Sequence, residues 1–292
     1  MKQLELKIKD EVFYVWHIKG PRNGPILHWS HANGFNAPTY SNLLKKLSQF
    51  CHVYAWDARA HGLSSHLKLP VKKNIYNQYV KDFIELINLL YKKHSSPIIV
   101  AGHSFGATVG LKAEKSLKDR ISKLILADPV LFTPFATRTS QFLRWLKFKK
   151  PRALYLAENA AKRQNIWLTK KDAFRSLSQK KLFKNWDATS LQNYIDYGIT
   201  DNAKNVQLRC PRNIESLIFK ESEYEFLSHE IANLSVESHV YLASTGSPAF
   251  AKNALQRSKN VKTLLTIPST NHLFPIEEFE EFSRRIFHHL TH

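Results

Sequence analysis

Cysteine and glycine are scarce in this chain, which has two cysteines and nine glycines among its 292 residues. The cysteines, Cys51 and Cys210, show no Cys-x-x-Cys spacing, so we expect two reduced thiols and no metal site. Twelve prolines are too few for a low-complexity chain, whereas 43% of the residues are hydrophobic. This composition excludes a disordered chain, and the lack of a fixed-period repeat excludes a solenoid or propeller.

Long apolar stretches are also missing. No window contains eighteen uncharged apolar residues, so we expect no transmembrane helix. Charged residues interrupt the first twenty positions, which is not the pattern of a secretory signal. We therefore expect a cytoplasmic protein.

Acidic residues are few: 24 Asp and Glu stand against 43 Lys and Arg, a net charge of +19. Residues 141–190 hold 13 of these basic and 3 of these acidic residues, about half of the excess, among many aromatic side chains. Such a segment favours either helices that bury their aromatics and expose their cations, or contact with an anionic membrane surface. Nucleic acid is a weaker prediction, because no binding motif accompanies the charge.

Short β-like runs alternate with helical patterns along most of the chain, which predicts an α/β fold with a mostly parallel central sheet flanked by helices. The expected strands are 4–8, 12–18, 26–30, 51–56, 97–101, 121–127, 239–243 and 261–267. The expected helices are 40–50, 76–91, 104–116, 249–258 and 276–290. The alternation stops after residue 131 and resumes near residue 236. We therefore assign 1–131 and 236–292 to the core and 132–235 to a basic, helical insertion.

The strongest motif is Gly-His-Ser-Phe-Gly at 102–106, placed between an expected strand and an expected helix. A sharp strand-to-helix turn exposes the serine hydroxyl above the sheet, and the two glycines leave room for the close backbone approach. The helix dipole then faces the charge that develops during attack. This context predicts that Ser104 is a nucleophile.

A second motif, His-Ala-Asn-Gly-Phe at 31–35, follows the strand 26–30. An oxyanion hole needs two backbone N–H groups aimed at one point. We expect one from Phe105, the residue after the nucleophile, and one from this loop. Phe35 is the first choice for the loop donor and Asn33 the second, while a plain Asn-Gly turn is the structural alternative.

Two further loops follow strands and reach the same sheet edge. In the loop 57–64, we expect an Asp57–Arg59 pair and His61 to have structural roles. In Asn-His-Leu-Phe-Pro at 271–275, we expect His272 to be the general base that meets the Ser104 hydroxyl. The histidines on or past the last helix are expected to be solvated; they are His288, His289 and His292.

In this order, the four motifs resemble those of the α/β-hydrolase fold family, in particular its capped serine esterases and lysophospholipases. The resemblance covers about 26–130 and 239–290, and the insertion 132–235 takes the place of the family's helical cap. It implies a covalent acyl-enzyme mechanism with no metal and no organic cofactor.

The chain departs from the family pattern at the usual position of the third catalytic residue. Relatives carry a carboxylate in the turn after the penultimate strand, but the turn at 243–250 contains none. The imidazole still needs a partner that holds its tautomer. Asp128, at the end of the strand after the nucleophile helix, is the favoured substitute, as in pancreatic-type lipases. The alternatives are Glu221, Glu223 and Ser247.

The sequence thus predicts a serine hydrolase that cleaves carboxylic esters, with Ser104, His272 and Asp128 as catalytic residues. Aromatic side chains in the insertion favour an apolar acyl ester or a lysophospholipid-like substrate. Two alternatives stay open: a C–C or thioester hydrolase with the same residues, and a non-catalytic binding protein on the same fold.

Overall fold

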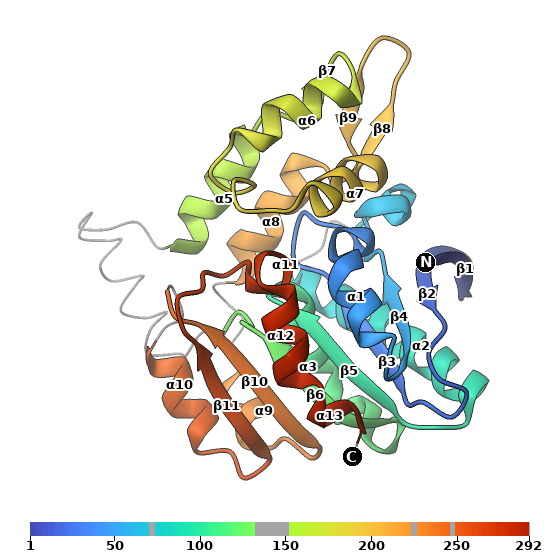
Figure 1. Cartoon of the computed structure of the whole chain (residues 1–292), viewed down its shortest axis with the longest axis vertical. Helices are drawn as coiled ribbons and strands as arrows, with labels where there is room; N and C mark the ends of the chain where they lie inside the picture. Colours follow the sequence, from blue (N-terminus) through green and yellow to red (C-terminus); the bar gives the residue numbers. More distant parts are fainter. Residues whose placement is uncertain (70–73, 132–151, 223–226, 246–248, 292) are drawn as a thin grey trace.

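The computed structural model describes residues 1–69, 74–131, 152–222, 227–245 and 249–291. Its core is an eight-stranded sheet in the order β1-β2-β4-β3-β5-β6-β10-β11 (Figure 1). The first two strands are antiparallel to their neighbours, and the other six are parallel. These strands are β1 (Lys2–Ile8), β2 (Glu11–Ile18), β3 (Ile26–Ser30), β4 (His52–Trp56), β5 (Ile98–His103), β6 (Ile121–Ala127), β10 (Glu237–Ala243) and β11 (Val261–Ile267). The predicted mostly parallel sheet is confirmed.

Helices cover both faces of this sheet (Figure 1). One face carries α2 (Ile75–His94), α3 (Phe105–Leu117), α9 (Ser228–Ala232) and α10 (Ala249–Gln256). The other carries α1 (Ser41–Leu47), α11 (Phe274–Glu277), α12 (Phe279–Ile286) and α13 (His288–Thr291). Three short 3-10 turns are η1 (Ala37–Tyr40), η2 (Gly62–His66) and η3 (Lys118–Arg120). Every residue of β3 and β5 is buried, because a parallel strand in the middle of such a sheet packs on both sides.

The insertion between β6 and β10 lies over the carboxyl ends of the parallel strands (Figure 1). Apart from α9, which packs on the core sheet, its described elements are α5 (Arg152–Lys162), β7 (Ile166–Trp167), α6 (Lys170–Ser178), α7 (Ala188–Gly198), β8 (Ile199–Asp201), β9 (Val206–Leu208) and α8 (Arg212–Ser222). The expected helices are present, but β7, β9 and β8 also form a small antiparallel sheet that was not expected from the sequence. Strands of two or three residues are too short to give a period-two pattern.

Aromatic side chains of the insertion are largely buried against the core. Trp167, Phe183 and Trp186 are all less than 9% exposed, whereas Tyr155 is 57% exposed. This favours the structural interpretation of the described aromatics over contact with lipid. Phe142, Trp145 and Phe148 of the basic stretch lie outside the described residues.

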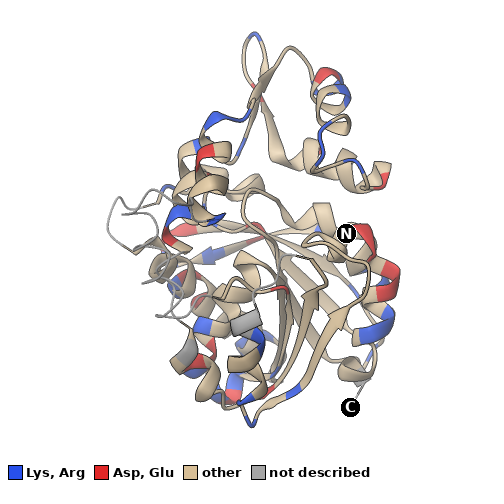
Figure 2. Ribbon diagram, turned by 90° about the vertical axis from the view of Figure 1, so that its left-hand side faces the viewer, with Lys and Arg blue, Asp and Glu red and all other residues tan. Residues whose placement is uncertain are grey.

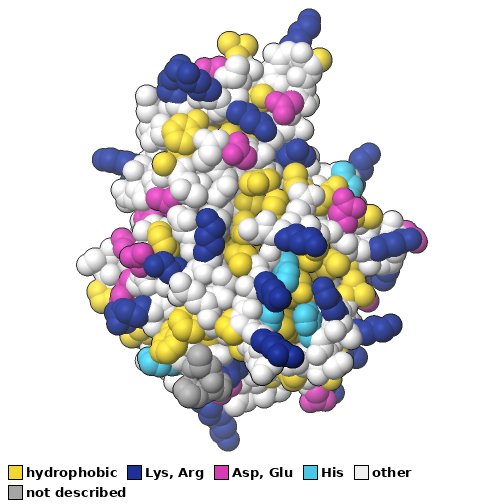
Figure 3. Space-filling view, turned by 45° about the vertical axis from the view of Figure 1, so that its right-hand side comes forward, with side chains coloured by type: hydrophobic (Ala, Val, Ile, Leu, Met, Phe, Trp, Pro, Cys, Tyr) yellow, Lys and Arg dark blue, Asp and Glu magenta, His cyan; other side chains and the backbone are white. Residues whose placement is uncertain are grey.

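Charges are mixed on the described surface. In the insertion, both basic and acidic residues occur (Figure 2), and ion pairs join Lys170 to Asp201 and Arg163 to Glu215. Lys and Arg side chains spread over both the insertion and the core on the face in Figure 3, consistent with the net charge of +19. None of the described helices combines the length and hydrophobicity that a membrane span needs.

Candidate active site

Ser104 occupies the turn between β5 and α3, in a strained backbone conformation with φ 53° and ψ −118°. The turn is crowded. A Cβ at Gly106 would lie 2.5 Å from the Ser30 carbonyl oxygen, and one at Gly102 would lie 2.9 Å from the Ala107 nitrogen. Only glycine fits at both positions, so the motif Gly-x-Ser-x-Gly has a steric cause. The turn places the hydroxyl at the carboxyl edge of the sheet, as the sequence predicts.

The structure brings Ser104, His272 and Asp128 into one hydrogen-bonded row. His272 lies between β11 and α11, and its Nε2 is 2.8 Å from the Oγ of Ser104. Its Nδ1 is 2.6 Å from Oδ2 of Asp128, which follows β6 directly. The second carboxylate oxygen, Oδ1, accepts a hydrogen bond from the amide of Ala243. The row has the order hydroxyl, imidazole, carboxylate that nucleophilic catalysis by serine requires.

The other candidates for the acid do not take this place. Glu221 accepts a hydrogen bond from the amide of Ile75 at the start of α2. Glu223 and Ser247 lie outside the described residues. The turn after β10 supports the His272 loop in another way, because the hydroxyl of Ser244 donates to the carbonyl of Thr270 at 2.8 Å.

His103, the residue before the serine, holds the same loop and was not singled out from the sequence. Its Nε2 donates to the carbonyl oxygen of His272 at 2.7 Å, and its Nδ1 lies 2.7 Å from the hydroxyl of Tyr40. Burial lowers the pKa of His103 to about 3, so the ring is neutral. Tyr40 in turn accepts a hydrogen bond from the amide of Ala32. This chain of contacts joins the loop 31–35 to the loop of His272.

The loop 31–35 contains a tight turn in which the amide of Phe35 donates to the carbonyl of Ala32 at 3.2 Å. Gly34, with φ +79°, supplies the left-handed third position of this turn. The N–H of Phe35 thus has a partner within the turn, which weighs against its expected role as an oxyanion donor. Within the described chain, the amides of Asn33 and Phe105 have no hydrogen-bond acceptor. The N–H of Phe105 lies in the first turn of α3, where helical amides lack partners.

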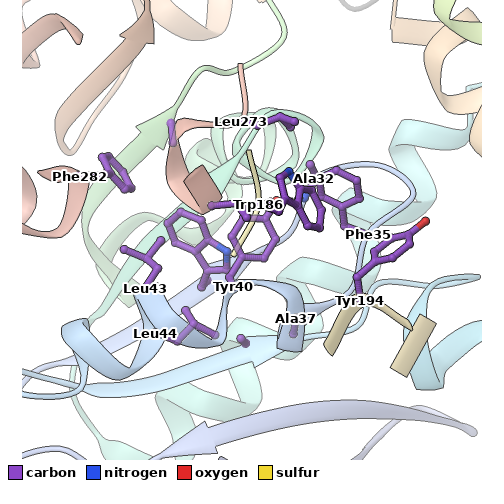
Figure 4. Close-up of a cluster of buried hydrophobic side chains, with 14 of the residues drawn as sticks. Ala32, Phe35, Ala37, Tyr40, Leu43, Leu44, Trp186, Tyr194, Leu273 and Phe282 are labelled. Atoms are coloured by element: carbon purple, nitrogen blue, oxygen red, sulfur yellow. The ribbon is translucent and has the colours of Figure 1, made fainter. Parts of the chain in front are cut away.

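Apolar side chains hold this loop from the other side. The ring of Phe35 contacts those of Trp186 and Tyr194 edge-on, at centroid distances of 5.2 and 5.8 Å (Figure 4). The side chain amide of Asn33 donates to the carbonyl of Glu215 in α8. The insertion thus fixes the position of the loop 31–35.

The predicted Asp57–Arg59 pair is wrong. Arg59 binds Glu11 and Asp82 instead, and its Nε lies 2.7 Å from the Asp82 carboxylate. Asp57 accepts hydrogen bonds from the amides of Ala37 and Leu63, among others. Burial raises the pKa of Asp57 to about 6. Both residues have the structural role that was expected, but Arg59 pairs with carboxylates that are distant in the sequence.

The remaining histidines near the site are buried and structural. His31 accepts a hydrogen bond from the amide of Ala58, and His61 lies 2.9 Å from the carbonyl of Arg59. Burial lowers the pKa of His31 to about 3 and that of His61 to about 4. Of the C-terminal histidines, His288 is exposed as expected, His289 is partly buried in contradiction to the expectation, and His292 lies outside the described residues.

The family follows from a comparison with known proteins. The model of a family described as serine aminopeptidase, S33, matches residues 26–192, more than half of the chain. The chain belongs to this family of α/β-hydrolases. The match confirms the resemblance drawn from the motifs and covers the loop 31–35, Ser104 and Asp128.

Individual relatives of this α/β-hydrolase match only part of the chain, at low sequence identity. The probable protein phosphatase methylesterase 1 of Caenorhabditis elegans is 28% identical over 131 residues, 43% of this chain and 35% of that protein. The human serine hydrolase-like protein is 31% identical over 114 residues, 39% of this chain and 54% of that protein. The chain thus spans about a third of the length of the methylesterase and about half of the length of the human protein. The crystal structure of E-2-(acetamidomethylene)succinate hydrolase superposes with a TM-score of 0.78 at 19% identity, covering 98% of each chain, which shows the shared fold.

Proposed function

We propose that this α/β-hydrolase is a serine esterase that cleaves carboxylic esters through an acyl-enzyme intermediate. The contact that carries the proposal is the 2.8 Å distance between Ser104 Oγ and His272 Nε2. Asp128 at 2.6 Å from the other ring nitrogen completes the set. A binding protein has no need of this alignment, so it argues against the non-catalytic alternative.

The geometry supports a two-step reaction. His272 takes the proton of Ser104 at Nε2 while the serine oxygen attacks the ester carbonyl, and Asp128 stabilises the imidazolium through Nδ1. The protonated ring then gives its proton to the departing alcohol, leaving an acyl group on Ser104. A water molecule, deprotonated by the same ring, then attacks the acyl carbon. The bond to Ser104 breaks, the ring returns the proton to the serine oxygen, and the acid is released. All proton transfers use side chains of the chain itself, and the mechanism requires no cofactor.

The oxyanion of the tetrahedral intermediate needs two donors. Phe105 supplies the first from the N-terminus of α3, where the helix dipole also favours negative charge. We assign the second to the amide of Asn33, in place of Phe35. The turn at Ser104 holds the amide of Phe105 in place, and the turn at Gly34 holds the amide of Asn33.

The substrate is proposed to carry an apolar acyl group. The side chains of Phe35 and Leu273, which flank the proposed oxyanion donor and the base, belong to the same buried apolar cluster (Figure 4). Ester hydrolysis also agrees with the name of the methylesterase relative. No contact of the described residues favours a thioester or C–C bond over an ester.

A panel of p-nitrophenyl esters of increasing acyl length tests this function. We expect kcat/KM to rise from the acetyl to medium acyl esters, and Ser104→Ala to reduce the rate to background. Turnover of the acetyl ester alone would contradict the proposal that the substrate carries an apolar acyl group. No turnover of any ester by the wild type, with retained fold, would overturn the esterase.

An anionic membrane surface remains a proposed partner of the insertion. The described part offers mixed charges and mostly buried aromatics, and the most basic stretch includes residues 141–151, which are not described. Sedimentation with vesicles that contain phosphatidylserine, compared with vesicles of phosphatidylcholine alone, tests it. Equal binding to both kinds of vesicle would contradict it.

A further inference from the structure

A second group of chemically active side chains lies at the edge of the sheet opposite to Ser104. Glu237 and His239 lie at the amino end of β10, and His289 belongs to α13. One potential ligand atom from each lies within 4.8 Å of the other two. Glu237 and His239 face the same way because alternate residues of a strand share a face. The proposed mechanism uses none of these three residues.

His239 is the buried centre of this group. Its side chain is 2% exposed, and its Nδ1 lies 3.0 Å from the hydroxyl of Thr263 on β11. Its Nε2 lies 2.9 Å from Oε1 of Glu237, but this contact lacks hydrogen-bond geometry, so Nε2 has no hydrogen-bond partner among the described residues. A buried ring nitrogen close to a carboxylate oxygen is an arrangement that a cation completes.

His289 is held in a similar way. Its Nε2 lies 2.9 Å from the hydroxyl of Tyr241, which leaves Nδ1 for another partner. Its ring stacks on that of His239, with centroids 3.5 Å apart and 13° between the planes. Metal-binding histidines usually have their second ring nitrogen fixed by such a neighbour. Here the hydroxyls of Thr263 and Tyr241 supply this support.

Charged side chains around the group act in both directions. The ammonium of Lys123, which donates to the carbonyl of His289, is the nearby charge that opposes a cation, and Glu237 offsets it.

We propose that Glu237, His239 and His289 form a binding site for a divalent transition-metal ion such as zinc. Two imidazoles and one carboxylate are a ligand set that zinc takes in proteins, with a fourth position left for water. The ion fastens the C-terminal helix α13 to the start of β10. The site is separate from Ser104 and independent of the proposed esterase function.

Binding requires a small rearrangement. Two ligands of a tetrahedral zinc ion lie about 3.4 Å apart, closer than the 4.8 Å limit here. The parallel rings also cannot direct both lone pairs at one point. His289 is the residue that turns, because it is partly exposed on a four-residue helix, whereas His239 is enclosed within the sheet.

Calorimetric titration of the full chain with zinc chloride, after EDTA treatment and removal of any affinity tag, tests the proposal. We expect one high-affinity equivalent in the wild type. Glu237→Gln and His289→Gln should weaken it by about tenfold or more, because each removes one of three ligands. His288→Gln is the matched control, since it removes the adjacent exposed histidine, and should leave the affinity unchanged.

Two further measurements distinguish loss of the metal site from misfolding of a variant. Tyr241→Phe keeps the ring and removes only the hydroxyl that holds His289, so it should weaken zinc binding by about tenfold. Cobalt substituted for zinc should give the strong visible absorption of a tetrahedral site in the wild type and lose it in His289→Gln. Absence of binding by the wild type, or equal binding by His289→Gln and the wild type, would overturn the site.

Discussion

His103 donates a hydrogen bond from its buried Nε2 to the backbone carbonyl of His272, over 2.7 Å. The neighbour of the proposed nucleophile thus holds the loop that carries the proposed base. Tyr40 contacts the other nitrogen of His103 and the amide of Ala32, so the same series of polar contacts reaches the loop 31–35. Three loops that are distant in sequence share one line of polar contacts, which fixes their relative positions.

This contact predicts that His103 is a positioning residue. His103→Ala should lower kcat by about 100-fold with little change in KM, because a displaced base loses alignment while substrate contacts remain. Tyr40→Phe, which removes only the hydroxyl, should lower kcat less. Steady-state kinetics, together with urea unfolding midpoints, separate this role from loss of stability. An unchanged kcat in a folded His103→Ala protein would contradict it.

Asp128→Asn tests the identity of the acid. The substitution keeps the shape of the side chain but removes the charge that stabilises the imidazolium, so kcat should fall by about 10⁴-fold while the protein stays folded. Glu221→Gln is the matched control, since the Glu221 carboxylate contacts the start of α2. Its kcat should equal that of the wild type. The reverse result for the two variants would assign the role to Glu221.

Replacing each of two glycines of α3 with alanine should have very different effects on stability. A Cβ at Gly106 meets the Ser30 carbonyl oxygen at 2.5 Å, and the strand backbone cannot yield. Gly106→Ala should therefore lower the free energy of unfolding by about 3 kcal/mol or prevent folding. At Gly110 the nearest atom is a methyl of Val100 at 3.0 Å, so Gly110→Ala should change stability by about 1 kcal/mol or less. Urea denaturation measures both, and equal effects would refute the packing argument.

Buried neutral histidines predict acid lability. His28, His31 and His103 have pKa values lowered to about 3 by burial, and that of His61 is lowered to about 4. The unfolded chain protonates these rings near pH 6.5, so it binds more protons than the fold below that pH. Their stabilising contribution is complete above pH 6.5 and is lost towards pH 4, by about 1.4 kcal/mol per pH unit for each ring.

The ionisation of Asp57 has the opposite effect on the pH dependence of stability. Its raised pKa, about 6, means that the fold binds a proton more readily than the unfolded chain does, so its contribution favours the fold at low pH and is lost as pH rises through 6. Four histidines outweigh one aspartate. Unfolding free energies measured from pH 7 to pH 4.5 should therefore fall steeply, and a flat profile would contradict the neutral rings.

The parallel sheet explains why much of the site could be predicted from the sequence. Ser104, Asp128 and His272 each follow a recognisable strand, and the carboxyl ends of parallel strands share one edge. Strand and helix positions in the core followed from hydrophobic periodicity. The small sheet of the insertion gave no such pattern, because its strands have two or three residues.

Contacts between distant residues could not be predicted. The partners of Arg59 come from β2 and α2, and no local pattern shows which carboxylate a buried guanidinium selects. The turn partner of the Phe35 amide has a different cause, because the direction of one amide depends on the exact turn that Gly34 forms. His103 occupies a motif position where any residue is allowed, so its role depends on coordinates.

Covalent labelling with a fluorophosphonate probe tests the central claim most directly. The probe reacts only with an activated serine, so mass spectrometry of the wild type should find one adduct on the peptide that contains Ser104. Ser104→Ala should carry no adduct, and Asp128→Asn should react far more slowly than the wild type. A folded wild-type protein that remains unlabelled, or that is labelled at another residue, would contradict the account.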